Sequence, residues 1–513
     1  MKQEMEQVFG NDYVSFRDKV KARIGEDRAR RYGEITAVLA LAEYRLEQVR
    51  DDCDFGITCL LDYDALFGKK QATRAVFSVL APVLWAATRT KYAFRKKAEI
   101  RTAFSDAFLF SRRYAAVRKR VDEKQGCTAL MTFLDAVKIE TRSTKELIRE
   151  SLRLDAGRVK PVWLPRFSVA GGKLQRELAD YYRLIHRDTY GTEPVTDAEW
   201  DAVLPRLRDA FTRRTAWLTK RLGKENLRLY LTVNQYHLRD LMIIRACRNA
   251  GIPTLQQEHH AMEFIRLPFD PERPMQRFSL VNHYGFWSRT EMAFHRKVFR
   301  YDNLLDPPEE NRYLVTGNTE VSYEQALAYQ RQYPTQRKLT YMTTGIEAET
   351  LSPEALEAYE KWRWALFAGL REFSRKQGIP VCLRYTPFRE MYFREREIPT
   401  LKEWGFTISD SVPENLMEDL CTSMAVMSST SSVLATARLF GKMIFRVEDV
   451  SIRYIHVDDS VHEVRIADLP ELTIPENAGT GPIDPAGFFD MDRLIRMLDE
   501  AGNDYPKQTG DGQ

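Results

Sequence analysis

Five consecutive hydroxyl-bearing residues separate two apolar stretches near the end of the chain. They are Ser428, Ser429, Thr430, Ser431 and Ser432. The short apolar run before them (424–427) is typical of a buried parallel strand, and apolar residues recur at helical spacing after them (433–440). Where a strand turns into a helix, free backbone N–H groups and the positive end of the helix dipole favour a phosphate, with hydroxyl donors beside them. The alternative is that the serines only cap the helix.

A second polar cluster follows a predicted strand (252–255) in the middle of the chain. Glu258, His259 and His260 come shortly after this strand. In an open α/β sheet, ligands bind at the carboxyl ends of the strands, so these side chains are candidates for acid–base catalysis or phosphate contact. The alternative is one packed and one exposed histidine. We expect no metal here, because adjacent side chains of an extended segment point in opposite directions and no third ligand is near.

Alternating strands and helices are needed to position both clusters. The predicted strands cover 128–134, 159–164, 227–233, 252–255, 284–288, 313–316, 339–342, 379–384, 406–408, 424–427 and 443–445. The predicted helices include 103–114, 240–249, 291–299, 353–376, 433–440 and 490–501. This alternation predicts an α/β protein with parallel sheets.

A chain of 513 residues is long enough for two domains, each with its own core. The expected order is a mostly helical N-terminal part (1–125), a Rossmann-like first domain (126–316), a linker (317–337), a Rossmann-like second domain (338–483), a C-terminal helix (484–502) and a disordered tail (503–513). We place the boundary between the two domains at the polar linker because strand–helix units occur on both sides of it.

Composition and charge are those of an ordinary globular protein. The net charge is only +4, from 77 basic and 73 acidic residues, so bulk charge does not favour a nucleic-acid partner. Six scattered cysteines without a CxxC pair predict reduced thiols and a cytoplasmic location. No transmembrane segment and no signal peptide are expected. Basic runs at 95–97 and 118–120 indicate solvated helix faces first and docking on an anionic membrane second.

Three segments resemble motifs of a known family in their order and spacing. RACRNAGIPTLQQEHH (245–260), YLVTGN (313–318) and SSVLATARLFGK (431–442) are similar to segments of bacterial surface-polysaccharide transferases of the GT-B fold, including capsule, polysialyl-type and polyol-phosphate-type enzymes. The resemblance covers roughly residues 225–446. It implies two Rossmann-like domains that face a cleft, with the final helix packed back near the first domain.

The resemblance assigns further residues to the site. His259 falls on the family's histidine, and Gly317 and Asn318 fall on the strand end that precedes the second domain. Thr436 stands where the family usually has a glutamate that holds the nucleotide ribose, and Thr386 stands where many relatives have a histidine. Arg384 is kept. The resemblance therefore implies altered donor contacts, and the alternative is that donor binding is lost.

The activity that the resemblance implies is transfer from a nucleotide-activated sugar, or polyol phosphate, donor in surface polysaccharide biosynthesis. Implied catalytic residues are His259, Glu258 and His260, and implied nucleotide- or phosphate-binding residues are Arg384, residues 428–432, Thr436, Gly317 and Asn318. No cofactor and no metal are required. The expected partners are the donor, a glycan acceptor, and the inner membrane or other glycan-assembly proteins through peripheral association, but no nucleic acid. A nucleotide-sugar epimerase or hydrolase of the same fold, or a non-catalytic member that binds a glycan or a partner protein, are the alternatives.

Overall fold

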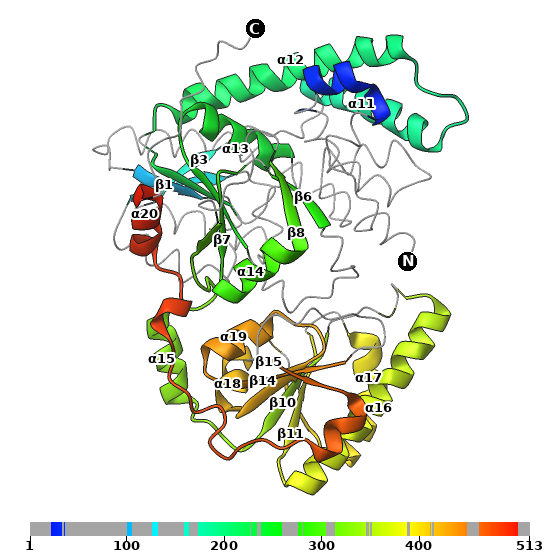
Figure 1. Cartoon of the computed structure of the whole chain (residues 1–513), viewed down its shortest axis with the longest axis vertical. Helices are drawn as coiled ribbons and strands as arrows, with labels where there is room; N and C mark the ends of the chain where they lie inside the picture. Colours follow the sequence, from blue (N-terminus) through cyan, green and yellow to red (C-terminus); the bar gives the residue numbers. More distant parts are fainter. Residues whose placement is uncertain are drawn as a thin grey trace.

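The computed structural model of the chain describes two α/β units, one on each side of a linker (Figure 1). The described residues are 22–32, 35, 100–104, 126–131, 159–163, 173–225, 227–232, 238–258, 275–279, 281–303, 313–344, 348, 351–386, 390–410, 412, 415–448 and 461–500. Most of the predicted helical N-terminal part, the predicted tail, and both His259 and His260 lie outside these residues.

Seven parallel strands form the first sheet, in the order β3-β2-β1-β4-β5-β7-β9. They are β1 (Ile100–Phe104), β2 (Gly126–Met131), β3 (Val159–Trp163), β4 (Leu229–Thr232), β5 (Thr254–Gln257), β7 (His283–Phe286) and β9 (Tyr313–Val315). Every residue of β4, β5 and β7 is buried, as expected of a parallel sheet covered on both faces. A separate parallel pair joins β6 (Met275–Ser279) to β8 (Phe299–Asn303).

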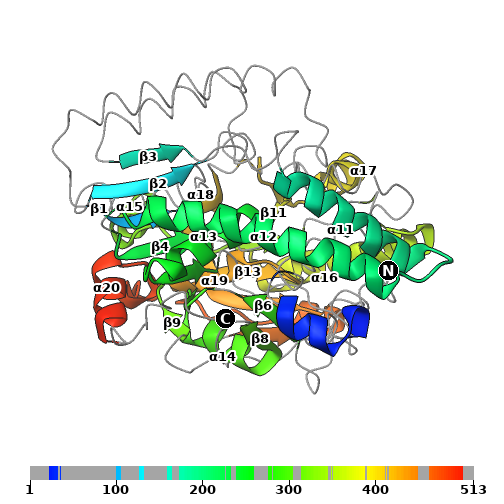
Figure 2. The ribbon, with the colours of Figure 1, turned by 90° about the horizontal axis from the view of Figure 1, so that it is seen from above.

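Several helices of the described residues belong to the same unit as this sheet. They are α11 (Lys173–Tyr190), α12 (Asp197–Leu222), α13 (Leu238–Asn249) and α14 (Arg289–Val298). Helices α11 and α12 pack side by side and cross the outer side of the sheet, on the side away from the second unit (Figures 1 and 2). Thr196 begins α12 with a capping box, in which its side chain accepts from Glu199 N–H and Glu199 accepts from Thr196 N–H.

One predicted helix was wrong at its start. Residues 103 and 104, expected to begin a helix that continues to 114, belong to strand β1. Ile100, Thr102 and Phe104 alternate with smaller or polar residues, and β-branched and aromatic side chains favour a strand once neighbours are available on both sides. Strand β1 pairs with β2 and β4, so pairing outweighs the local pattern.

Six parallel strands form the second sheet, in the order β12-β11-β10-β13-β14-β15. They are β10 (Leu339–Met342), β11 (Val381–Arg384), β12 (Thr407–Ile408), β13 (Ala425–Ser428), β14 (Met443–Val447) and β15 (Val461–Val464). The helices are α16 (Pro353–Gln377), α17 (Met391–Glu403), α18 (Leu416–Thr422) and α19 (Val433–Leu439). Two parallel sheets confirm the prediction of an α/β protein with a doubled strand–helix pattern.

Helix α16 shows how local sequence sets an element of the second sheet. Ser352 caps its start by accepting from Ala355 N–H, Pro353 occupies its first turn, and Gly378 ends it with φ of 60°. Its buried apolar side chains recur every three or four residues and face the sheet; they are Trp362, Leu366, Phe367, Leu370 and Phe373. One charged residue, Arg363, lies on this buried face.

The end of the chain returns to the first sheet. After the linker helix α15 (Tyr323–Gln332) and the second sheet, α20 (Met491–Glu500) places Arg493 so that its Nη2 donates to the carbonyl of Thr316 at 2.8 Å. Asn318 and Phe488 form a parallel bridge beside this contact. The returning segment therefore closes on the strand end that precedes the linker.

Gly317 permits this closure, and its replacement has a predictable cost. Its φ is +92°, and a Cβ at this position would lie 2.3 Å from the carbonyl carbon of Phe488. We expect Gly317→Ala to lower the free energy of unfolding by about 2–4 kcal/mol, from positive φ and overpacking together. Chemical denaturation would measure it. Gly405→Ala is the matched control, because Gly405 has φ of +88° with nothing within 4 Å; equal losses in both variants would contradict the close contact with Phe488.

Lys442 connects the linker, through Thr335, and the segment after β15, through Gly479, to the second sheet. It is buried just before β14, and its Nζ donates to Thr335 Oγ1 at 2.8 Å, Cys421 O at 2.7 Å and Gly479 O at 3.0 Å. All three acceptors are neutral. Burial consequently lowers the pKa of Lys442 from 10.5 to about 8.

This lowered pKa predicts a pH dependence of stability. Between pH 8 and 10.5 the unfolded chain binds a proton at Lys442 that the folded protein releases, so the free energy of unfolding should rise with pH across this window. The contribution should be on the order of 3 kcal/mol, fully present above pH 10.5 and lost as the pH falls from 10.5 to 8. Denaturant unfolding of the wild type and Lys442→Met at pH 7 to 10.5 would isolate it. A difference between the two proteins that does not change with pH would contradict this assignment.

Candidate active site

The strand order of the second sheet creates a switch point between β10 and β13. From β10 the chain continues to β11 and β12 on one side and then returns to β13 on the other side. Connections diverge at such a point, and ligands of parallel α/β sheets bind outside the carboxyl ends of the strands there. Ser428 ends β13, and its hydroxyl donates to the carbonyl of Met342, the last residue of β10, at 2.8 Å. The five-residue hydroxyl cluster therefore begins at the switch point.

The hydroxyl cluster differs in exposure along its length. Ser428 and Ser429 are buried, whereas Thr430, Ser431 and Ser432 are half-buried. Ser431 Oγ accepts from Val433 N–H at 3.3 Å, while Ser432, at the cap position of α19, makes no side-chain cap hydrogen bond. Helix capping thus accounts for one hydroxyl at most. Helix α19 has only seven residues, so its start alone does not make an anion site. Hydroxyl and backbone N–H donors would have to hold an anion here.

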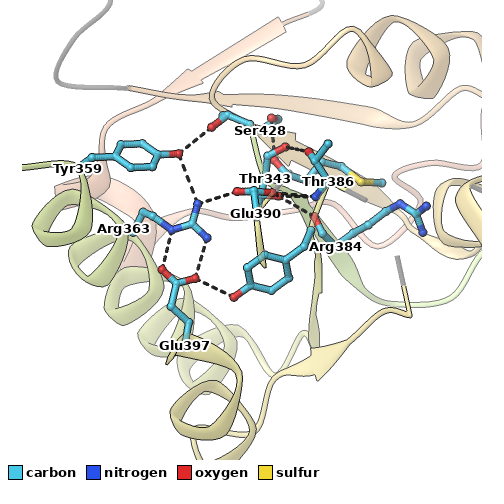
Figure 3. Close-up of polar contacts among 11 residues, drawn as sticks. Thr343, Tyr359, Arg363, Arg384, Thr386, Glu390, Glu397 and Ser428 are labelled. Atoms are coloured by element: carbon cyan, nitrogen blue, oxygen red, sulfur yellow. Dashed lines mark hydrogen bonds and ion pairs between the residues drawn. The ribbon is translucent and has the colours of Figure 1, made fainter. Parts of the chain in front are cut away.

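A buried network of one arginine and two glutamates adjoins the same strand ends (Figure 3). Arg363 on α16 binds Glu397 on α17 through two parallel bonds of 2.7 Å, and its Nη1 lies 2.9 Å from Glu390 Oε1. The three side chains are at most 3% exposed. Tyr385, just after β11, donates from its hydroxyl to Glu397 Oε2 at 2.8 Å. Bidentate geometry makes the Arg363–Glu397 pair the strongest contact of the network.

The electrostatics of the network are asymmetric. Burial by itself lowers the pKa of Arg363, but the hydrogen bonds and charge interaction with Glu397 outweigh it and hold that pKa well above its ordinary value. One guanidinium thus serves two carboxylates in a region with almost no water contact. Such a network depends strongly on each member, since removing the single cation leaves buried negative charge.

Glu390 connects the network to the two strand ends. Its Oε2 accepts from the N–H of Thr386 at 2.8 Å and from the hydroxyl of Thr343. Thr343 follows β10, Thr386 follows β11 by two residues, and Thr386 Oγ1 donates to the carbonyl of Thr343 at 3.2 Å. The carboxylate therefore fixes the loops that border the switch point, as the contacts drawn in Figure 3 show.

Arg384, predicted to contact phosphate, is engaged elsewhere. Its side chain points away from the network in Figure 3, and its Nη1 lies 2.5 Å from Asp419 Oδ2 on α18. It also donates to Ser409 Oγ at 3.2 Å and to Val412 O at 2.7 Å. The guanidinium is only 5% exposed and holds the loop after β12 against α18. Phosphate binding by Arg384 stays a prediction.

Glu258, predicted as a catalytic residue, directly follows the last residue of β5 and precedes His259 and His260 in the sequence. It is 3% exposed, and its Oε1 accepts from Gln256 Nε2 at 3.1 Å. The backbone N–H of Glu258 donates to Gly285 O at 2.9 Å, which extends the pairing of β5 with β7. This places the carboxylate at the carboxyl end of the first sheet, as the strand assignment predicted.

Trp287 joins this strand end to the second sheet. Its indole N–H donates to the carbonyl of Glu258 at 2.9 Å, and Ser288 Oγ accepts from Arg438 Nη2 of α19 at 3.2 Å. The indole is 3% exposed, in an apolar cluster with residues of the second unit. Its buried companions are Met342, Leu420, Val426, Leu434, Ala435, Ala437, Ile444 and Val461. The carboxyl ends of β5 and β7 therefore meet the helix that follows the hydroxyl cluster.

Two residues predicted at the donor site lie together at this junction. Asn318 Nδ2 donates to Thr436 Oγ1 at 3.5 Å, and Thr436 Oγ1 donates to Glu320 Oε2 at 3.4 Å. Asn318 and Thr436 are buried, whereas Glu320 is half-buried. A carboxylate from the linker thus lies beside the threonine that stands where the resemblance implies a glutamate.

Sequence reasoning missed several of these residues. The only sequence feature that points to Glu320 is its position three residues after Gly317. No local sequence pattern indicates that Trp287 lies between the two sheets. Glu390 and Glu397 are seven residues apart, a spacing that places them on one helix face, but their common partner Arg363 is on another helix.

The described residues contain neither a cluster of metal-ligating side chains nor a membrane-spanning helix. No group of three or more His, Cys, Asp or Glu side chains within the described ranges could hold a metal ion. Among the helices that the structure describes, none is both long and apolar enough to cross a bilayer. The expected independence from metal stays a prediction.

No protein-family model and no curated protein matches the chain. Among solved structures, a UDP-GlcNAc 2-epimerase from Neisseria meningitidis bound to UDP-GlcNAc is 11% identical, with 78% of this chain and 99% of that chain covered and a TM-score of 0.41. The wall teichoic acid polymerase TagF is 12% identical, with 84% and 91% covered and a TM-score of 0.34. Os79 from O. sativa in complex with UDP and deoxynivalenol-3-glucoside is 11% identical, with 78% and 90% covered and a TM-score of 0.32. At such identities and TM-scores, these similarities carry no argument about the activity of the chain.

Proposed function

We propose that the protein is a glycosyltransferase that uses a nucleotide-activated sugar, or polyol phosphate, donor in surface polysaccharide biosynthesis. The observation that carries the proposal is the junction at Trp287. There the carboxyl end of β5, with Glu258, meets α19, which follows the hydroxyl cluster at the switch point of the second sheet. Three motifs that are far apart in the sequence supply these strand ends, which supports the family resemblance on which the proposal draws.

The donor would bind on the second sheet. In this proposal its phosphates accept from the backbone N–H groups and hydroxyls of Thr430, Ser431 and Ser432, which are half-buried and so reachable. Glu320 and Thr436 would bind a ribose hydroxyl, with the Glu320 carboxylate as acceptor. Glu390 acts indirectly, because it holds the Thr343 and Thr386 loops that border the site.

Charge development would determine the chemistry. As the anomeric bond breaks, the leaving phosphate gains negative charge, and fixed N–H and hydroxyl donors stabilise it without reorganisation. The acceptor hydroxyl must lose a proton, which Glu258 or His259 would take, with His260 as the second candidate. Such an enzyme would meet its donor in the cytoplasm and its acceptor there or at the inner membrane.

A ligand screen followed by an activity assay would test the proposal. Nucleoside mono- and diphosphates would first be ranked by thermal shift, since a bound ligand raises the melting temperature by mass action. Nucleotide sugars with the selected base would then be incubated with and without glycan acceptors. The proposal expects donor consumption that requires an acceptor.

The other outcomes separate the alternatives. Epimerisation or hydrolysis of the donor without an acceptor would identify an enzyme of the second class. Absence of any nucleotide-dependent shift would refute the donor site and leave a binding protein. A Thr430→Val/Ser432→Ala variant should lose the nucleotide shift while keeping its unfolding midpoint, and Thr212→Val, exposed on α12, is its control.

A further inference from the structure

The second half of α12 exposes a tryptophan among cations. Trp217 is 41% exposed, and the described residues contain only two other exposed large hydrophobic side chains, Met391 and Val412. The α12 basic patch, as we name it, consists of Arg213, Arg214, Trp217, Lys220, Arg221 and Lys224. Three members, at spacings of four and three residues, are exposed and share one face of the helix: Arg213, Trp217 and Lys220. Lys224 is exposed just beyond the end of the helix at Leu222.

Charge is strongly segregated along this helix. No acidic residue occurs between Asp209 and Glu225, whereas Asp197, Glu199 and Asp201 lie in the first turns. Two of these acids bind Arg28 at 2.7 Å, so the acidic end is occupied within the protein. The basic end of α12 and the turn after it therefore carry five positive charges, from Arg213 to Lys224, without an acidic residue between them.

The opposite face of α12 is used for folding. Its buried residues pack against α11 and α13 and include Phe211, Leu218 and Leu222. Figures 1 and 2 show α12 on the outer side of the first unit, away from the second unit. The patch is thus carried by a helix whose opposite face is buried, and Trp217 belongs to none of the apolar clusters formed by the described residues.

The faces of the indole are already engaged. The guanidinium carbons of Arg214 and Arg221, three residues before and four after Trp217, lie 5.8 and 5.9 Å from the ring centroid. Stacking of a nucleobase on this ring would have to displace a guanidinium. Contact through the exposed part of the ring, with the cations beside it, leaves both interactions in place.

We propose that the α12 basic patch docks the protein on the surface of an anionic phospholipid bilayer. Tryptophan prefers the membrane–water interface, and clustered Lys and Arg are attracted to anionic headgroups. Because the apolar face of α12 is buried in the protein, docking leaves the helix in its domain and inserts only the indole. The proposal does not depend on the proposed transferase activity.

Vesicle co-sedimentation would test this proposal directly. The full chain should bind to vesicles of phosphatidylcholine mixed with phosphatidylglycerol. It should bind far less to vesicles of phosphatidylcholine alone. Raising sodium chloride towards 1 M should weaken binding, because screening shortens the reach of the charges from about 10 Å to about 3 Å. Lys220→Glu/Lys224→Glu should lower the partition coefficient at least about tenfold, and Trp217→Ala about three- to tenfold.

Matched variants control for net charge and for exposed apolar surface. Lys361→Glu/Lys402→Glu changes the net charge equally at exposed sites of the second unit, and Met391→Ala removes another exposed apolar side chain. Both should bind vesicles like the wild type. No binding to anionic vesicles, equal losses in patch and control variants, or binding to single-stranded RNA in place of vesicles would each overturn the proposal. If Trp217→Ala fails to fold, the Lys220→Glu/Lys224→Glu variant still tests the proposal. Its unfolding midpoint should equal that of the wild type, because both lysines are exposed.

Discussion

Arg363→Ala is expected to lower the free energy of unfolding by about 3–5 kcal/mol, as measured by chemical denaturation. Arg363 is 1% exposed and is the only cation that binds Glu390 and Glu397 within the described network. Its removal leaves two carboxylates buried without the charge that stabilises them.

A surface arginine on the same helix serves as the control. Arg375 lies on α16 with a 69% exposed side chain and pairs with Glu372 at 2.5 Å. Arg375→Ala should lower the free energy of unfolding far less than Arg363→Ala, as is typical of exposed ion pairs. Similar losses in both variants would mean that the network of Figure 3 does not form.

The strands of the second sheet were predictable because local pattern and tertiary environment agree. The strand predicted at 339–342 matches β10, and the helix predicted from Pro353 matches the start of α16. Short apolar runs buried on both faces, a capping serine and a terminal glycine are all visible in the sequence. The positions of these elements needed no long-range information.

Other elements lacked such a pattern. Helix α17 contains Pro399 and buries Glu397 between Phe393 and Leu401, so its inner face does not read as apolar. Strand β15 exposes both of its central residues at the edge of the sheet. In these segments the fold is decided by partners that are distant in sequence, as it is for β1.

The candidate site was predictable in its strand ends but not in its pairing. That the hydroxyl cluster and Glu258 would follow buried strands came from periodicity. Arg384 pairs with Asp419, 35 residues away, and no local pattern in the sequence indicates this partner. Likewise, the contact between Glu320 and Thr436 spans 116 residues. Periodicity carries no information about which charged side chains meet across a sheet.

Glu258→Gln is expected to lower turnover about 100-fold or more while leaving the unfolding midpoint nearly unchanged. Glutamine keeps the side-chain shape, and its carbonyl oxygen can still accept from Gln256 Nε2, now 3.1 Å from Oε1. What it loses is the ability to take a proton from an acceptor hydroxyl. Donor affinity, measured by the nucleotide thermal shift, should therefore stay the same in this variant.

The neighbouring histidines distinguish a proton acceptor from a packed side chain. His259→Ala should also lower turnover about 100-fold if this residue shares the proton transfer or contacts the phosphate. His260→Ala should not, because the sequence predicts an extended segment in which adjacent side chains point in opposite directions. A destabilised His259→Ala protein with normal specific activity would identify a packed histidine. Normal turnover in Glu258→Gln together with a large loss in His259→Ala would assign the base to the histidine and leave Glu258 a buried carboxylate that orients Gln256. Equal losses in both histidine variants would mean that the chain after β5 is not extended. In an extended segment the two neighbouring side chains point in opposite directions and could not both reach the same substrate.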